Sequence, residues 1–472
     1  MNNTPHPGRL FRLLLLCVLC PALLGSCRTK PGAQTETTDM DFPQLKEKGE
    51  ITAVTLYSST SYFLYRMEPM GYEYELIRDF AQMHNLKLTV KVAESQARLI
   101  EMLQAGEADV AAYPILFSQE LKQQLIYCGR ESLSSQALVQ SLGPGVKRLT
   151  DVTGLIGKEI YVKSGSRYHD RLQNLDRELG GGILIHEVDD DDVSEEDLIE
   201  MVSTGQIPYT VSDEKVALLN KTYYWNIDVS LKISFRQRSS WAVRKNAPLL
   251  AEAINQWASG QESDQSYKAT AKRYFELSKK ILEQSTPAIR QGQISPYDSL
   301  FRKYARKLEW DWRLLASLAY QESHFKNTEI SWAGAQGLMG IMPGTARTLR
   351  IPLQDLADPE VSIRAGVEVL YIFRQGLNEI TDATELIKFT LAAYNAGIGH
   401  IYDARRLAGK YGKDSTVWDD HVAEFVLLKS EPAYYNDPVC RYGYLRGRET
   451  FYYVREILGR YEYYCQQTLA SQ

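Results

Sequence analysis

The most constraining feature of this chain is a change of pattern near residue 276. Before it, short strand-like runs alternate with helical patterns, as in residues 51–56, 74–83 and 86–92. From about residue 296 onward the chain reads as a series of helices without a convincing pair of strands. Alternation predicts an α/β body with largely parallel sheets, and the helical series predicts a mainly α body. A chain of 472 residues is long enough for both.

Composition excludes some classes of partner. The formal net charge of −5 gives no general case for nucleic-acid binding. The seven histidines are scattered, and no Cys/His cluster has the spacing of metal ligands. We therefore expect no nucleic acid, no metal and no cofactor. The 30 tyrosines suit a cleft that faces carbohydrate, although a tyrosine-rich core would explain the same number.

The N-terminus has the features of a targeting segment. Arg9 and Arg12 precede an apolar run over residues 13–24, which is too short to span a bilayer. The run ends in Leu24-Gly25-Ser26-Cys27, which resembles a bacterial lipobox. The resemblance implies a signal peptide over residues 1–27, a lipid on Cys27 and a flexible tether over residues 28–43. A plain signal peptide with an incidental cysteine is the alternative.

The lipid would anchor the mature protein at the periplasmic face of a membrane. Arg28 and Thr29 follow the cysteine, so no aspartate retention signal is visible and the outer membrane is favoured. In such an oxidising compartment Cys440 and Cys465 could form a disulfide.

Four short motifs follow one another within residues 44–275. They are Leu45-Lys-Glu-Lys-Gly-Glu-Ile51, Gly71-Tyr72-Glu73-Tyr74-Glu75-Leu76, Leu103-Gln-Ala-Gly106-Glu-Ala-Asp109 and Gly154-Leu-Ile-Gly157-Lys158. In this order they resemble the extracellular solute-binding proteins of family 3. The resemblance implies a bilobal α/β domain of the periplasmic-binding-protein type, with a ligand cleft that closes by hinge motion.

Two positions bear on the ligand of that cleft. The family grips a ligand carboxylate with an arginine after Thr-x-x, whereas this chain reads Ser118-Gln-Glu-Leu121. A free amino acid is therefore not assumed as the ligand. Asp213 matches the family's aspartate-bearing segment and is a candidate contact for an ammonium group, although a helix N-cap explains the same residue.

Glu322 stands out in the helical part of the chain. Leu315, Leu318, Ala319 and Glu322 are spaced i, i+3, i+4 and i+7, so they share one face of a helix. A carboxyl in register with an apolar stripe is desolvated, and its pKa is raised. Such an acid can stay protonated near neutral pH. An exposed glutamate at the helix end, or a buried salt bridge, would explain the same pattern.

Three further motifs follow Glu322-Ser323. A glycine-rich turn with Met339 and Gly340 spans residues 334–346, Ala-Tyr-Asn-Ala-Gly occupies residues 393–397, and Glu-Thr-Phe-Tyr-Tyr-Val occupies residues 449–454. Singly, a loop, a helix C-cap and core packing would explain them. In this order they resemble the lytic transglycosylases with a soluble-lytic-transglycosylase, goose-lysozyme-like domain. The resemblance implies a mainly α catalytic domain over residues 296–465, joined by a linker over residues 276–295.

The resemblance also implies roles for individual residues. Glu322 would be the catalytic acid and base, and Ser323, Met339, Tyr394, Asn395 and Tyr453 would orient the substrate and support it. Gly340 departs from the pattern, because the family usually has glutamine there, and one hydrogen-bond donor of the cleft is lost.

The implied reaction cleaves the MurNAc–GlcNAc bond of peptidoglycan strands and forms 1,6-anhydro ends with one carboxyl group. Most glycosidases need two. The binding domain would then sense muropeptides or cell-wall peptides and adjust the catalytic domain. A hydrolytic lysozyme with an unrecognised second carboxylate and a non-catalytic peptidoglycan-binding sensor are the alternatives.

Overall fold

The computed structural model describes residues 40–143, 147–189, 193–260, 265–276, 293–328 and 330–469. The predicted signal peptide, the lipidation site Cys27 and nearly all of the tether lie outside these residues, as does most of the predicted linker. Within the described ranges, no helix combines the length and the apolar character needed to cross a membrane.

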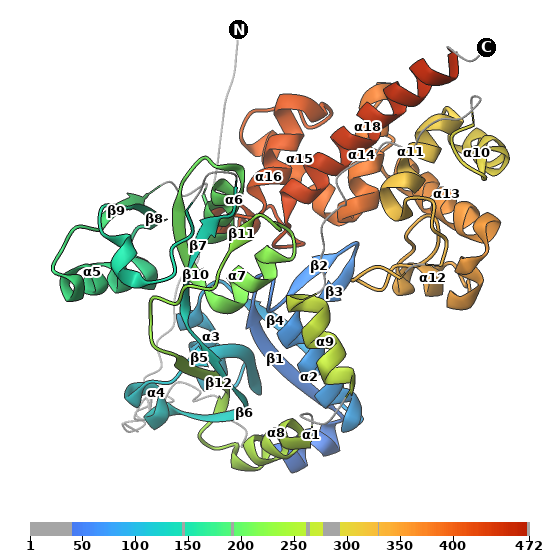
Figure 1. The fold of residues 1–472 in the computed structure, drawn as a ribbon. Coiled ribbons are helices and arrows are strands. Elements are labelled where there is room, and N and C mark those ends of the chain that lie inside the picture. Colours follow the sequence, from blue (N-terminus) through green and yellow to red (C-terminus); the bar gives the residue numbers. More distant parts are fainter. Residues whose placement is uncertain are drawn as a thin grey trace, which may run out of the picture. The chain divides into compact units, whose positions relative to one another are not determined.

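The first α/β lobe is built on a five-stranded sheet in the order β4-β1-β5-β12-β6 (Figure 1). Strand β1 runs parallel to β4 and β5, whereas β12 runs antiparallel to β5 and β6. The strands are β1 (Glu50–Leu56), β4 (Lys87–Ala93), β5 (Val110–Leu116), β6 (Leu125–Ser134) and β12 (Gln237–Arg244). The helices are α1 (Phe42–Lys48), α2 (Tyr72–Met83), α3 (Gln96–Gln104), α4 (Gln119–Gln124), α8 (Pro248–Gly260) and α9 (Gln265–Phe275).

The second lobe repeats this plan with the sheet order β11-β7-β10-β8-β9. Strand β8 is parallel to β9 and β10, and β7 is antiparallel to β10 and β11. The strands are β7 (Gln136–Ser141), β8 (Glu159–Lys163), β9 (Leu184–Val188), β10 (Tyr209–Asp213) and β11 (Ile227–Asp228). The helices are η1 (Val152–Leu155), α5 (Arg167–Leu179), α6 (Glu195–Thr204) and α7 (Glu214–Lys221).

The predicted bilobal α/β architecture is confirmed, and the sheets are largely parallel as expected, except for one strand in each. In each sheet two pairings are parallel and two are antiparallel, because four strands run in one direction and a single strand, β12 or β7, runs against them. The reason is the path of the chain, which enters the second lobe directly from β6 to β7 and returns to the first sheet as β12. Such crossings need no crossover helix, so they produce antiparallel pairs.

A two-stranded hairpin in the first lobe was not predicted. It consists of β2 (Phe63–Tyr65) and β3 (Glu68–Met70), with Tyr65 opposite Glu68. Arg66 and Met67 form its turn in the left-handed region, with φ of 50° and 68°. Two left-handed residues in a two-residue loop match the twist of the strands, but asparagine and glycine are the residues that usually signal such a turn.

The chain from residue 298 onward is helical and encloses its own core (yellow to red in Figure 1). Helix α18 packs against α11, α14 and α16. The α-helices are α10 (Asp298–Ala305), α11 (Trp312–Ser323), α12 (Pro343–Thr348), α13 (Pro359–Gly376), α14 (Ala383–Ala396), α15 (Ile398–Lys410), α16 (Ala423–Leu428), α17 (Pro432–Tyr435) and α18 (Gly447–Leu469). The shorter turns are η3 (Arg306–Leu308), η4 (Leu353–Ala357) and η5 (Trp418–Val422).

Candidate active site and ligand cleft

Helix α11 places Glu322 in an apolar setting. The helix is capped by the Asp311 side chain and ends before His324, which adopts the left-handed conformation. Leu315 and Leu318 on the same face are fully buried. The Glu322 side chain is 4% exposed, so the predicted desolvation of this carboxyl is confirmed.

Two side chains hold the carboxylate of Glu322. Arg66 Nη2 lies 2.9 Å from Oε1 and 3.0 Å from Oε2, and the Tyr453 hydroxyl donates to Oε1. Burial raises the pKa of Glu322, while the Arg66 charge and the Tyr453 hydrogen bond oppose that rise. The desolvated acid and the buried salt bridge, which were alternatives for the sequence, therefore coexist.

Arg66 reaches this site from the turn of the β2–β3 hairpin in the binding domain. Its neighbours in the hairpin also contact the catalytic domain: Glu68 accepts a hydrogen bond from the Gly344 N–H, and Met67 packs on Gly397. The Arg66 side chain is 11% exposed and lies over the Tyr394 ring. Sequence reasoning missed this residue, because nothing local to residues 63–70 points to a site 256 positions away.

Gly340 provides the space for this arrangement. Its φ is 59°, and its carbonyl accepts a hydrogen bond of 2.9 Å from Arg66 Nη1. A Cβ atom at this position would lie 2.2 Å from Glu322 Oε2 and 3.4 Å from Arg66 Nη1. Any side chain at position 340 would therefore displace Glu322 from its place beside Arg66.

Three of the residues that were predicted to orient the substrate make hydrogen bonds or packing contacts within the protein in this structure. Ser323 Oγ donates to the Leu338 carbonyl at 2.9 Å, and the Tyr394 hydroxyl donates to the Met339 carbonyl at 2.7 Å. The Met339 side chain is fully buried against Gly366, where a Cβ would lie 2.7 Å from it. These contacts fix α11, α13 and α14 against the glycine-rich turn, and the Met339 side chain is fully buried, so it offers no exposed surface to a sugar.

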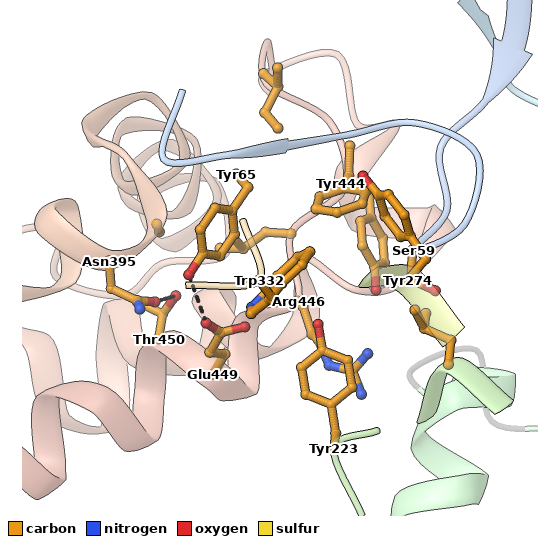
Figure 2. Close-up of a pocket in the computed structure, with 15 residues that line it drawn as sticks. Ser59, Tyr65, Tyr223, Tyr274, Trp332, Asn395, Tyr444, Arg446, Glu449 and Thr450 are labelled. Atoms are coloured by element: carbon orange, nitrogen blue, oxygen red, sulfur yellow. Dashed lines mark hydrogen bonds between the residues drawn. The ribbon is translucent and has the colours of Figure 1, made fainter. Parts of the chain in front are cut away.

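Asn395 lies at a second contact between the domains. Its Oδ1 accepts a hydrogen bond of 2.8 Å from Thr450, and the Tyr65 hydroxyl of the hairpin lies 3.4 Å from the Glu449 carboxyl (Figure 2). Burial raises the pKa of Glu449. These side chains surround a cavity of about 30 Å³. Glu449 is thus a half-buried carboxyl that belongs to one of the sequence motifs but that the sequence does not mark as a second acid.

A larger cleft of about 820 Å³ is lined by residues of both α/β lobes. Asp213 lies in it at the end of β10 and accepts hydrogen bonds from the Lys215 N–H at 2.9 Å and from Ser134 Oγ at 2.9 Å. Both interpretations of Asp213 therefore fit, because it caps α7 and also lines the cleft.

The cationic groups of this cleft come from the second lobe. Ser118, where the family motif would lead to an arginine, caps α4 instead. Lys163, Arg167 and Lys215 line the cleft, and Arg167 forms an ion pair of 3.1 Å with Asp213. The sequence did not mark these three residues, because the family pattern points to the segment Ser118–Leu121 for a residue that binds a carboxylate.

The sequence left open whether Cys440 and Cys465 form a disulfide. In the structure both are free thiols. Cys440 follows the turn after α17 and Cys465 lies near the end of α18, and neither position was constrained by the sequence pattern.

Two known families match successive parts of the chain. Residues 53–277 match the bacterial extracellular solute-binding proteins, family 3, and residues 299–417 match the transglycosylase SLT domain.

Curated relatives carry both parts in one protein. A membrane-bound lytic murein transglycosylase F of Desulfosudis oleivorans is 30% identical over 422 residues, which cover 89% of this chain and 90% of that protein. The protein of the same name from Aeromonas salmonicida is 31% identical and covers 96% of this chain and 88% of its own length. The chain belongs to the membrane-bound lytic murein transglycosylase F family. A third member, from Pseudomonas fluorescens, is 30% identical over 447 residues.

Membership of the transglycosylase F family makes the chain an enzyme that acts on peptidoglycan. It also identifies the bilobal part as a domain that accompanies the catalytic part throughout these relatives, since each match extends over most of both chains.

Proposed function

We propose that the chain cleaves the bond between N-acetylmuramic acid and N-acetylglucosamine and leaves a 1,6-anhydro ring on the muramic residue. The observation that carries the proposal is the setting of Glu322, a carboxyl that is 4% exposed and bonded by Tyr453. Burial favours its protonated form, which is the form that a general acid requires.

One carboxyl group is enough for this reaction. Glu322 gives its proton to the glycosidic oxygen as the bond from that oxygen to C1 breaks. The N-acetyl oxygen of the same muramic residue stabilises the positive charge that develops at C1. The C6 hydroxyl then attacks C1 and returns its proton to the Glu322 carboxylate, so the acid is regenerated and no water is consumed.

The binding domain controls this reaction through Arg66. While Arg66 occupies both oxygens of Glu322, the space beside Gly340 and Tyr394 is about 30 Å³. That volume accommodates a water molecule or two, not a sugar ring. The hairpin must withdraw before a glycan strand can reach the acid.

The second lobe is also attached to the catalytic domain. Arg446 donates to Glu196 at 3.0 Å and to Asn220 at 2.7 Å, and Arg448 donates to Glu200. Because the first lobe holds the active site through Arg66, a change of angle between the lobes strains one of the two attachments. A cell-wall peptide that binds between the lobes can therefore be sensed at Glu322.

The enzyme acts at the periplasmic face of the outer membrane, anchored by a lipid on Cys27. The lipobox sequence supports this placement, and the curated relatives are named membrane-bound.

The catalytic proposal is tested with Glu322→Gln and with mass spectrometry of fragments released from purified sacculi. The wild-type enzyme is expected to release fragments one water lighter than hydrolytic products, and the variant to be slower by roughly 10²- to 10⁴-fold. Glu462→Gln, on an exposed position of α18, is the matched control and should keep full activity. Anhydro products at an undiminished rate from Glu322→Gln would refute the assignment.

The same data separate the alternatives. Reducing ends from the wild-type enzyme would favour a hydrolytic lysozyme, and Glu449→Gln would then show whether the Glu449 carboxyl is the second acid. Glycan binding without any released fragment would favour a non-catalytic sensor.

A further inference from the structure

Helix α18 carries a buried arginine that lies against α11, the helix that carries the proposed acid. Arg460 is 5% exposed. In the part of the chain that the structure describes, its hydrogen bonds go to the Ser317 carbonyl at 3.2 Å and to Gln321 Oε1 at 2.8 Å, and no carboxylate pairs with it. A buried cation is costly to desolvate, and it is usually paired with a carboxylate. The place of this arginine in the fold is therefore explained by what it holds in α11.

The amide of Gln321, the residue directly before Glu322, joins two charged side chains of α18. Its Oε1 accepts a hydrogen bond from Arg460, and its Nε2 donates to Glu456 Oε2 at 2.9 Å. Gln321 is 8% exposed. Both hydrogen bonds involve a charged group, and such bonds are roughly twice as strong as bonds between neutral groups. The end of α11 is therefore fastened to α18 one residue before the acid.

The same face of α18 also contacts the acid itself. Tyr453, Glu456 and Arg460 are spaced i, i+3 and i+7, so they follow one another along one side of the helix. The first of them donates a hydrogen bond to Glu322 Oε1, and the other two hold Gln321. A displacement of α11 along α18 that breaks the contacts of Arg460 therefore moves the Glu322 carboxyl away from the Tyr453 hydroxyl.

The turn after the acid has an uncommon conformation. His324 and Phe325 both adopt the left-handed region, with φ of 52° and 61°. This region is uncommon for residues other than glycine, and surrounding contacts must enforce it. The Tyr320 ring packs against the rings of both residues, with centroid distances of 4.7 and 5.3 Å, and its centroid also lies 4.8 Å from the Arg460 guanidinium carbon. Arg460 therefore supports the aromatic ring that holds this turn.

We propose that Arg460 is a positioning residue for the reaction, because its guanidinium group holds the last turns of α11 in register with α18 and thereby keeps the Glu322 carboxyl against the Tyr453 hydroxyl. At 5% exposure the Arg460 side chain offers little surface to a glycan strand, so it acts through these two residues. This inference rests on the proposed function, in which Glu322 is the acid that forms the anhydro ends.

The ionisation of Glu322 reports on this arrangement. Burial raises the pKa of Glu322, whereas the Arg66 charge and the Tyr453 hydrogen bond lower it. Loss of the Tyr453 bond should therefore raise this pKa. Because the acid acts in its protonated form, the alkaline limb of the pH profile then moves to higher pH. The titratable groups that face Glu322 are Arg66 and Tyr65 of the hairpin, Tyr394 of α14, and Tyr453 and Glu449 of α18.

The test is the rate at which full-length enzymes release anhydro ends from purified glycan strands, compared between the wild type, Arg460→Met, Tyr453→Phe and the double variant. We expect Arg460→Met to lower kcat by roughly 10- to 100-fold, because a misplacement of about 1 Å can cost about 10²-fold in rate. KM should stay unchanged, since Arg460 does not touch the substrate. The alkaline limb of the kcat profile should move up by roughly half a pH unit to one unit, as the loss of one hydrogen bond to the carboxylate allows. In the Tyr453→Phe enzyme, which already lacks that bond, Arg460→Met should change kcat by less than about 2-fold and leave the limb in place.

Arg455→Met is the matched control. Arg455 lies on the same helix α18, but it is exposed, and its guanidinium carbon lies 4.6 Å from the centroid of the Tyr452 ring. The control should keep the kcat and the alkaline limb of the wild-type enzyme. Gln321→Met removes the same contacts from the side of α11 and should reproduce the lowered kcat and the shifted limb, even where Arg460→Met does not fold. Circular dichroism checks that each variant is folded.

Three results would overturn the inference. They are a wild-type kcat in folded Arg460→Met or Gln321→Met, a raised KM as the sole effect, and an equal loss of kcat with and without the Tyr453 hydroxyl. Each of them leaves the proposed function intact as long as the wild-type enzyme forms anhydro ends. A wild-type enzyme that forms no anhydro ends would refute the proposed function, and this inference with it.

Discussion

At the scale of single residues, three positions meet at one carboxyl group. Glu322 is the proposed acid, Arg66 forms an ion pair with its carboxylate, and Gly340 leaves the space in which they meet. The absent side chain at position 340 therefore has a structural explanation, because a Cβ there would lie 2.2 Å from Glu322 Oε2.

Replacing Arg66 should change the pH dependence of the reaction. Burial raises the pKa of Glu322, and the Arg66 charge limits that rise, so Arg66→Gln should raise this pKa further. The acid must be protonated to act, and activity is lost as pH rises through its pKa. The alkaline limb of the kcat/KM profile, which reports the free enzyme, is therefore expected at higher pH in Arg66→Gln than in the wild-type enzyme. A limb that stays in place or moves to lower pH would mean that Arg66 does not set the charge state of Glu322.

The sequence predicted one half of this contact and not the other. The burial of Glu322 follows from a helical spacing over eight residues, which is local information. Arg66 lies 256 residues earlier in a turn whose two left-handed residues are arginine and methionine. No propensity rule predicts a turn from arginine and methionine, so the contact between Arg66 and Glu322 could be found only from the three-dimensional structure.

At the scale of elements, a buried ion pair organises the part of the catalytic domain that contacts the binding domain. Lys429 after α16 donates to Asp403 on α15, and both side chains are fully buried. Asp403 also accepts hydrogen bonds from the backbone N–H groups of Arg441 and Tyr442 at 2.9 and 2.8 Å. The pair therefore fixes the segment that leads into α18 and its motif.

Removing the cation of this pair should destabilise the catalytic domain. Lys429→Met leaves the Asp403 carboxylate buried without its lysine partner, which typically costs about 3–5 kcal/mol. Urea denaturation followed by circular dichroism measures the change. Lys413→Met, which removes an exposed partner of Glu424, is the control and should cost less than about 1 kcal/mol. A similarly small effect of Lys429→Met would show that the segment is held by other contacts.

Strand order and the reversed strand of each sheet could not be predicted at this scale. Periodicity placed the strands near residues 51–56 and 86–92, close to β1 and β4 as observed. It carries no information on which strands pair, and the return of the chain as β12 makes the first sheet mixed.

At the scale of the whole molecule, a carboxyl group of the catalytic domain, Glu431, lies beside a carboxyl group of the second lobe, Asp197. Burial and the neighbouring Asp197 of the second lobe raise the pKa of Glu431 to about 9, while the pKa of Asp197 is lowered. Two carboxyl groups this close cannot both carry a negative charge at low cost, so one remains protonated.

The folded protein should lose the stability that Glu431 contributes as pH rises. The folded protein holds a proton on Glu431 between the usual pKa of 4.5 and about 9, whereas the unfolded chain releases it in that interval. The contribution of Glu431 to the free energy of unfolding is therefore fully present below that interval and is lost as pH rises through it. The midpoint of thermal unfolding should drop less between about pH 5 and about pH 9 in Glu431→Gln than in the wild-type protein or the exposed control Glu462→Gln. An identical drop in all three proteins would contradict a proton held on Glu431 in the folded protein.

The most direct test of the whole account is the initial rate at which the full-length protein releases anhydro-ended fragments from purified sacculi, compared between the wild-type enzyme and Arg66→Gln. Because Arg66→Gln removes the ion pair to Glu322, the variant should release fragments roughly 5- to 150-fold faster than the wild-type enzyme, which is the usual range of coupling between two sites. The double variant Arg66→Gln/Glu322→Gln should be slower than Arg66→Gln by roughly 10²- to 10⁴-fold. A folded Arg66→Gln enzyme that is no faster than the wild-type enzyme, or a double variant that forms anhydro ends as fast as Arg66→Gln, would contradict the claim that Arg66 restrains a lone catalytic acid.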